Sequence, residues 1–129
     1  MQKNFAKSND KIVGKHIYAN LYDVSEEKVF YDKTFCEDLI KKAVENAKAT
    51  LLDIKSWEIK GEKGGISVIA LVAESHIALH SWKEYRYVVI DIFTCGYSSD
   101  PWKAWDFIKN KLKPKDYSIH FSDRSMPSI

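Results

Sequence analysis

The order of apolar and polar residues along the chain predicts a series of strands and two helices. Six segments show the strand pattern, which is either a period of two or a short unbroken apolar run. These segments are 11–22, 50–59, 65–73, 76–82, 87–95 and 117–121. Two other segments place apolar residues three and four positions apart, as an amphipathic helix does, and these are 34–49 and 100–113.

Signals at the helix ends support this assignment. Thr34 and Glu37 form a capping box for the first helix, and Asp100 followed by Pro101 begins the second. Most strands follow one another directly, as in hairpins. The expected fold class is therefore α+β, a two-layer sandwich in which a mainly antiparallel sheet carries two helices on one face. A length of 129 residues, 45% of them apolar, suits a single domain, 1–129.

Composition argues against several function classes. The formal charge is +2, from 20 basic and 18 acidic residues, so no strong field favours nucleic acid or an anionic membrane as partner. No apolar run reaches the roughly 20 residues that span a bilayer, and the polar segment 1–11 lacks the apolar core of a signal peptide. We expect a cytoplasmic protein. Cys36 and Cys95 have neither a disulfide framework nor a metal-ligand spacing, so we expect no metal.

One predicted strand ends in an unusual run of functional groups. The apolar run from Ile66 to Ala73 is followed at once by a carboxylate, a hydroxyl and an imidazole, at Glu74, Ser75 and His76. A hydrolase triad is not indicated, because the Gly-x-Ser-x-Gly elbow is missing. The run nevertheless marks this strand end as the candidate site.

Hairpin geometry brings the Ser75 hydroxyl close to a thiol. If the hairpin turns between Glu84 and Tyr85, opposed residues have numbers that sum to about 169. Ser75 then faces Thr94 or, after a slight shift, Cys95. Cross-strand partners have Cβ atoms roughly 5 Å apart, so both groups can touch one small substrate. By itself, however, a cysteine at the end of a buried strand is most simply a core residue.

The second imidazole, His80, is harder to place. Five residues of straight strand carry it roughly 16 Å from Ser75 and onto the opposite face of the sheet. Either the chain bends near Ser75, or His76 is the imidazole that serves the hydroxyl. The sequence leaves both alternatives open.

Residues 74–96 read "ESHIALHSWKEYRYVVIDIFTCG". This stretch resembles the pyruvoyl-dependent decarboxylases of the prokaryotic S-adenosylmethionine decarboxylase family, whose pattern is Glu-Ser-His, then His-Thr-Trp, a Glu-Tyr pair and a closing Thr-Cys-Gly. Ser81 stands where the family usually has threonine. The likeness extends to "GKHIYANLYDV" near the start and to "DPWKAWDFI" after the cysteine, so it covers most of the chain.

The resemblance implies self-processing between Glu74 and Ser75. The Ser75 hydroxyl would attack the Glu74 carbonyl, and elimination would release fragment 1–74 (the beta chain). Fragment 75–129 (the alpha chain) would then begin with a pyruvoyl group derived from Ser75, which forms a Schiff base with the substrate amine. His80 matches the processing base of the family. Cys95 matches the proton donor to the substrate α-carbon, a role that requires a neutral thiol.

Three features favour arginine over S-adenosylmethionine as the substrate. The segment "GEKGGISV" has no aromatic residue where the adenosyl branch carries Phe-x-Pro, which can stack on adenine. Asn20 stands where that branch commonly has an acid. The stretches "KGGISVIALV" and "SDRS" look like the arginine branch. Candidate ligands for a guanidinium group are Asp53, Glu58 and Asp91, of which none is assigned.

The resemblance therefore predicts a decarboxylase of polyamine biosynthesis that converts L-arginine to agmatine. S-adenosylmethionine decarboxylase, which makes the aminopropyl donor for spermidine, is the alternative. An unprocessed, non-enzymatic binding domain is the alternative from a different class. Neither fragment is long enough to hold a core alone, so we expect the two to stay associated, and we expect a homodimer or a larger oligomer.

Overall fold

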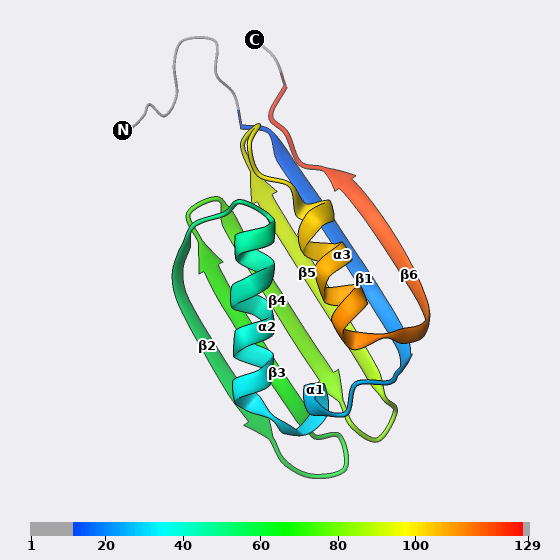
Figure 1. Cartoon of the computed structure of the whole chain (residues 1–129). Helices are drawn as coiled ribbons and strands as arrows, with labels where there is room; N and C mark the ends of the chain where they lie inside the picture. The colour runs from blue at the N-terminus through cyan, green and yellow to red at the C-terminus, as the bar shows by residue number, and fades with distance from the viewer. Residues whose placement is uncertain (1–11, 128–129) are drawn as a thin grey trace.

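The computed structural model describes residues 12–127, and its secondary structure follows the predicted order (Figure 1). This part of the chain contains six strands and three helices. In chain order they are β1 Gly14–Val24, α1 Lys28–Tyr31, α2 Lys33–Asn46, β2 Leu51–Ile59, β3 Gly65–Val72, β4 Ser75–Trp82, β5 Tyr87–Cys95, α3 Pro101–Leu112 and β6 Pro114–Asp123. All six predicted strands and both predicted helices are present.

The six strands form one sheet in the order β2-β3-β4-β5-β1-β6, and every neighbouring pair is antiparallel. The first strand of the chain therefore lies inside the sheet, between β5 and β6 (Figure 1). In the β4–β5 hairpin His76 pairs with Phe93, so the register predicted from the turn position is confirmed.

Helices α2 and α3 lie side by side on one face of the sheet (Figure 1). Alternate residues of the inner strands point toward them, because successive side chains in a strand face opposite sides. The expected two-layer α+β sandwich is confirmed. The side chains buried between the layers include Ile17, Leu21, Ile40, Val44, Ile66, Val68, Ile77, Leu79, Val88, Ile90, Ile92, Ile108 and Leu112.

The start of α2 differs from the prediction. Asp32 is the N-cap, and its carboxylate accepts a hydrogen bond from the backbone N–H of Phe35 at 3.0 Å. Thr34 lies within the first turn, so the predicted capping box is wrong. Glu37 instead accepts a hydrogen bond from the Ser56 hydroxyl and ties α2 to β2. Asp32 was overlooked because Asp and Thr are both good N-caps and the two lie only two positions apart.

The short helix α1 was not predicted, because four residues are too few to show a helical period. It is tied to the sheet by Ser81, whose hydroxyl donates to the Val29 carbonyl at 2.8 Å and accepts from the Ile66 N–H at 2.9 Å. At α3 the prediction is confirmed: Asp100 caps the helix by accepting from the Trp102 N–H at 3.0 Å.

The other face of the sheet is not covered by any described helix (Figure 1). Strand alternation places Tyr18, Tyr22, Trp57, Ile69 and Leu71 on this open face, where each is 41–52% exposed. The open face therefore exposes apolar and aromatic side chains to solvent.

No helix in residues 12–127 is long and apolar enough to cross a membrane. The expectation about the polar segment 1–11 lies outside the described residues.

Candidate active site

The turn between β3 and β4 contains only two residues, Ala73 and Glu74, and its geometry is unusual. Two-residue hairpins normally place a positive φ on a turn residue. Here neither turn residue has one, and the positive φ, +146°, falls on Ser75 instead. A non-glycine residue in this conformation costs on the order of 1–3 kcal/mol. The bond between Glu74 and Ser75 therefore lies beside a strained residue.

Neighbouring strands hold this strained turn in place. Ser75 pairs with Val72 across the hairpin. The Glu74 carboxylate accepts a hydrogen bond from the Thr50 N–H at 2.9 Å, and the Ala73 N–H donates to the Thr50 carbonyl at 2.8 Å. Both turn residues are therefore hydrogen-bonded to Thr50, which directly precedes β2. The turn cannot change its conformation without breaking these bonds.

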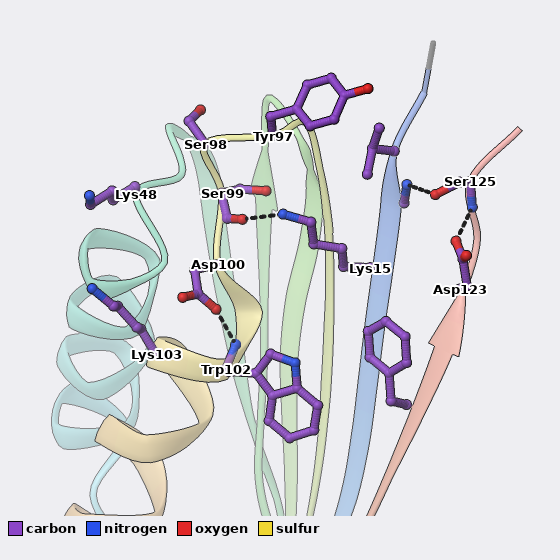
Figure 2. A pocket seen from close by; sticks show the side chains of 13 residues that line it. Lys15, Lys48, Tyr97, Ser98, Ser99, Asp100, Trp102, Lys103, Asp123 and Ser125 are labelled. Carbon is purple, nitrogen blue, oxygen red and sulfur yellow. Dashed lines mark hydrogen bonds between the residues drawn. The ribbon is translucent and has the colours of Figure 1, made fainter. Parts of the chain in front are cut away.

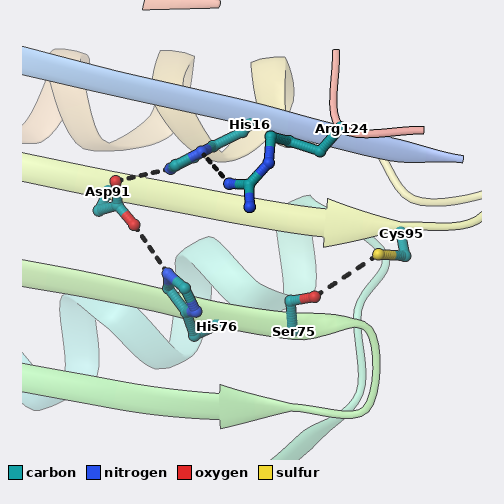
Figure 3. A network of polar contacts seen from close by, with 6 residues as sticks. All are labelled: His16, Ser75, His76, Asp91, Cys95 and Arg124. Carbon is teal, nitrogen blue, oxygen red and sulfur yellow. Dashed lines mark hydrogen bonds and ion pairs between the residues drawn. The ribbon is translucent and has the colours of Figure 1, made fainter. Parts of the chain in front are cut away.

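The Ser75 side chain lies against Cys95 at the end of β5. Oγ of Ser75 and Sγ of Cys95 are 3.5 Å apart (Figure 3). The backbone register extends from the pair of His76 and Phe93 to place Ser75 opposite Thr94, and the serine side chain reaches one residue further. The predicted neighbourhood of hydroxyl and thiol is confirmed.

The loop after β5 is fixed where it leaves Cys95. Gly96 has a φ of +97°, a conformation that glycine adopts without strain. The Ser99 hydroxyl donates to the Cys95 carbonyl at 2.9 Å, and Lys15 Nζ donates to the Ser99 carbonyl at 2.7 Å (Figure 2). These bonds fix the backbone of Cys95, and with it the position of the thiol beside Ser75. A cavity of about 540 Å³ is lined by the following part of this loop, including Tyr97 and Ser99 (Figure 2).

Ser75 and Cys95 both line a cavity of about 860 Å³. Its walls are mainly apolar, with side chains from Ile12, Leu52, Leu71 and Val72. Within the described residues, Glu74 is the only lining residue with a formal charge. A pocket of this kind suits a small molecule with an apolar stem and a positive group.

The two cysteines have different environments. Cys36 is fully buried in α2, and its thiol donates to the Val29 carbonyl at 3.4 Å. Burial, with a smaller contribution from the charge of Asp32, raises the pKa of the Cys36 thiol to about 12. Cys95 is only half-buried and lines the cavity. Cys36 is therefore a core residue, whereas Cys95 is accessible to a ligand.

The structure does not bring His80 to Ser75. Every residue of β4 from Ser75 to His80 is paired with β3 without a break, so the suggested bend is absent. The two residues lie five positions apart in a regular strand, roughly 16 Å along it. Nδ1 of His80 lies 2.8 Å from the Ser67 hydroxyl, its cross-strand partner.

The other imidazole of the motif, His76, belongs to a network on the open face of the sheet (Figure 3). Its Nε2 is 2.7 Å from one Asp91 oxygen, and Nε2 of His16 is 2.7 Å from the other. The Arg124 guanidinium donates to Nδ1 of His16 at 3.2 Å. No described hydrogen bond joins His76 to Ser75.

The two imidazoles determine the charge state of Asp91. Burial raises the pKa of the Asp91 carboxyl, but hydrogen bonds and charge from His16 and His76 outweigh this, and the pKa lies below its ordinary value. Each carboxylate oxygen already accepts from one imidazole, so a guanidinium group at Asp91 would have to share these oxygens with His16 and His76. The candidate Asp53 lies exposed on β2, with Lys55 3.9 Å away.

Residue 75 fits a pyruvoyl group. It is the first residue of β4, its side chain opens into the cavity, and the Cys95 thiol lies beside it. In residues 12–127 no cluster of three or more His, Cys, Asp or Glu side chains is arranged to bind a metal ion.

Comparison with known proteins identifies the family of this chain. The model of the S-adenosylmethionine decarboxylase family matches residues 15–125. This chain belongs to that family. It is 52% identical to the arginine decarboxylase proenzyme of Hyperthermus butylicus over 116 residues, which cover 90% of this chain and 81% of that protein. It is 50% identical to the arginine decarboxylase proenzyme of Aeropyrum pernix over 119 residues, or 92% and 89% of the two chains.

A third relative, the arginine decarboxylase proenzyme of Ignicoccus hospitalis, is 46% identical over 121 residues, or 94% of this chain and 83% of that protein. Among solved structures, the adenosylmethionine decarboxylase of Aquifex aeolicus superposes with a TM-score of 0.81 at 29% identity. The match covers 92% of this chain and 96% of that one. The family and the fold expected from the sequence are confirmed.

Reading the sequence missed two polar residues of this family member. Ser67 was taken only as part of an apolar strand, although the β3–β4 register could have paired it with His80. Asp91 was seen only as a candidate substrate ligand. Its link to His16 could not be predicted, because β1 is distant in sequence and pairs with β5 only in the folded sheet.

Proposed function

We propose that the protein is a cytoplasmic, self-processing, pyruvoyl-dependent arginine decarboxylase. The observation that carries the proposal is the strained Ser75, which follows the Glu74 peptide bond and lies 3.5 Å from the Cys95 thiol. The curated relatives at 46–52% identity are named arginine decarboxylase proenzymes, which supports both the substrate and the processing.

In the processing reaction, the Ser75 hydroxyl attacks the Glu74 carbonyl carbon. The C–N bond breaks, the new C–O bond makes an ester, and the amine of residue 75 becomes free. A base then removes the Cα proton of residue 75, and Glu74 leaves as a carboxylate. The dehydroalanine that remains rearranges, and water releases its nitrogen as ammonia to leave the ketone. The positive φ of Ser75 favours the first step, because the strained N–Cα torsion is released once the amide is gone.

In the decarboxylation reaction, the pyruvoyl group supplies an electron sink for the charge left when carbon dioxide departs. The Cys95 thiol lies beside residue 75 and delivers the proton to the substrate α-carbon. The apolar walls of the cavity exclude water from that carbon. The Ser99 and Lys15 contacts keep the thiol in place during turnover.

The cavity also supports a cationic substrate. Glu74 is the one formally charged lining residue among those described, and no lysine or arginine joins it. After cleavage Glu74 also carries a free α-carboxylate. A guanidinium or ammonium group is therefore favoured over a neutral or anionic one.

His80 requires a second copy of the chain in this proposal. A base for the Cα proton has to reach residue 75, but His80 of the same chain lies roughly 16 Å along the strand. His80 projects from the open face, whose exposed aromatic and apolar side chains we propose to be covered by another protomer. Antiparallel pairing of two open faces brings His80 of one copy toward Ser75 of the other, with Ser67 holding the imidazole.

Processing should not separate the two fragments. Fragment 1–74 supplies β1, β2 and β3, and fragment 75–129 supplies β4, β5 and β6. Because the sheet order is β2-β3-β4-β5-β1-β6, strands of the two fragments meet at three places. The mature protein is therefore held together by interleaved strands.

The first prediction concerns the cut. Purified protein should separate under denaturing conditions into 1–74 and 75–129, the latter with a ketone at its start, and should elute as one species under native conditions. Intact mass measures the fragments. The Ser75→Ala variant should stay uncut and inactive. A full-length, hydroxylamine-insensitive chain that still decarboxylates arginine would contradict processing.

The second prediction tests the function itself. Fully cleaved protein should release carbon dioxide from arginine faster than from ornithine, lysine or S-adenosylmethionine. Citrulline, which has the length of arginine but no charge, should show kcat/KM about 10- to 100-fold lower, because charged hydrogen bonds contribute about 1.5–3 kcal/mol. Faster turnover of S-adenosylmethionine would reassign the substrate. A chain that stays uncut and decarboxylates none of these compounds would be the unprocessed binding domain.

The third prediction separates Cys95 from Ser75. Cys95→Ala should process normally but lose about 10²- to 10⁴-fold in decarboxylation, the usual contribution of a positioned proton donor. Protonation at residue 75 instead of at the substrate would convert the ketone to alanine and release the matching aldehyde. Mass spectrometry of fragment 75–129 detects this change. Near wild-type turnover without it would make Cys95 a structural thiol.

The fourth prediction tests whether His80 acts between copies. Ser75→Ala and His80→Ala chains should each stay uncut when expressed alone. When the two are expressed together, the His80→Ala chain should be cut, because its partner supplies the imidazole. Differently tagged chains and intact mass identify which is cleaved. Efficient cutting of His80→Ala alone would show that another base is used.

A further inference from the structure

The network around Asp91 fixes the tautomer of two histidines. Arginine only donates hydrogen bonds, so the contact of Arg124 with Nδ1 of His16 means that this nitrogen carries a lone pair. The proton of His16 is therefore on Nε2, where it is donated to Asp91. The second Asp91 oxygen must accept from Nε2–H of His76.

This arrangement leaves Nδ1 of His76 as an acceptor. No hydrogen bond within residues 12–127 engages that nitrogen, and the ring turns it to the side on which Ser75 lies (Figure 3). His76 is 41% exposed at its side chain and pairs across the hairpin with Leu71, which lines the cavity. His76 does not itself line the cavity, but it follows residue 75 in the chain and lies directly across from Leu71, which forms part of the cavity wall.

The reaction needs such a nitrogen. The α-amino group of arginine is an ammonium at neutral pH and has to lose a proton before its lone pair can attack a ketone. Cys95 is assigned to a later proton, and His80 of the same chain lies at the far end of β4. His80 of the proposed second copy is assigned to the Cα proton of the processing step, so neither group is assigned to the substrate ammonium. A base held by a carboxylate beside the reacting position is the arrangement that proton transfer requires.

We propose that His76 is a catalytic base that accepts the proton of the substrate α-ammonium at Nδ1, and that Asp91, His16 and Arg124 are positioning residues that fix its tautomer. This inference rests on the proposed decarboxylase function. The proton passes from the substrate nitrogen to Nδ1, and the imidazolium that forms keeps its Nε2–H bond to the Asp91 carboxylate. The amine is left neutral and its lone pair is free.

The charges around Asp91 are consistent with this role. The titratable and charged groups that face it are His76 from β4, His16 from β1 and, beyond His16, Arg124 after β6. The lowered pKa of the carboxyl means that Asp91 is ionised at neutral pH and can accept from both imidazoles.

The substitution Asp91→Asn tests the tautomer directly. Asparagine has one acceptor oxygen and one NH₂ group. Because Arg124 keeps His16 a donor at Nε2, the amide oxygen of the new side chain has to face His16 and its NH₂ group has to face His76. His76 is then forced to carry its proton on Nδ1, where it can no longer act as a base.

The first readout does not depend on activity. In uncut Ser75→Ala protein, ¹⁵N spectra of the histidine rings should show His76 protonated at Nε2, and adding Asp91→Asn should move that proton to Nδ1. A His76→Asn sample identifies the signals. A His76 tautomer that does not respond to Asp91→Asn would overturn the proposal, whether or not the protein decarboxylates arginine.

The second readout is a rescue. In cleaved protein, Asp91→Asn should lower kcat for arginine about 10- to 100-fold, the usual loss when the outer partner of a functional imidazole is removed, with a smaller change in KM. Arg124→Met frees His16 to switch tautomer, so the amide at position 91 can turn its oxygen to His76. The double variant should therefore recover most of the lost kcat. Asp116→Asn, which changes a carboxylate on β6, is the matched control.

A purely structural role of Asp91 predicts the opposite result. The losses from Asp91→Asn and Arg124→Met would then multiply in the double variant, and this outcome would overturn the proposal. Rates are compared per cleaved chain, as counted by intact mass, so differences in processing do not enter. If wild-type protein fails to decarboxylate arginine, the proposed function is wrong, and the ring spectra still decide the tautomer.

Discussion

The positive φ of Ser75 is the constraint around which this molecule is organised. Neither Ala73 nor Glu74 in the two-residue turn has the positive φ that such a turn usually contains, and the strain falls on the first residue of β4. Pairing with Val72 and the bonds between the turn and Thr50 prevent its release by movement. Chemical change at the adjacent peptide bond is the remaining way for the strain to be relieved.

The two faces of the sheet carry different kinds of side chain. The face toward α2 and α3 is almost entirely apolar and supplies the burial that supports the strained turn. The open face carries the imidazoles, Asp91 and the aromatic side chains, which a packed core would exclude unless each polar group were paired. Ser75 and Cys95 lie where these two environments meet, at the end of the hairpin. A reactive group there is supported by the core but reached from the cavity.

Sequence reasoning predicted those parts of the site that depend on local geometry. Strand periods and the position of one turn gave the register that brings Ser75 to Cys95. The same reasoning placed His80 five residues from Ser75 but could not decide whether the strand bends, because straightness depends on pairing with β3. The Asp91 network could not be predicted from the sequence, because the pairing of β1 with β5 leaves no local signal in it.

The interleaved strand order also has a consequence for the refolding of the cut protein. The intact chain folds as one molecule, with β1 inserted between β5 and β6 while all strands are covalently joined. After the proposed cut, the same sheet would be a complex of two chains, and refolding after complete unfolding would be a bimolecular reaction that fails at low concentration. A mature protein of this kind would persist through slow unfolding rather than through refolding. Each molecule of such an enzyme can be assembled only once.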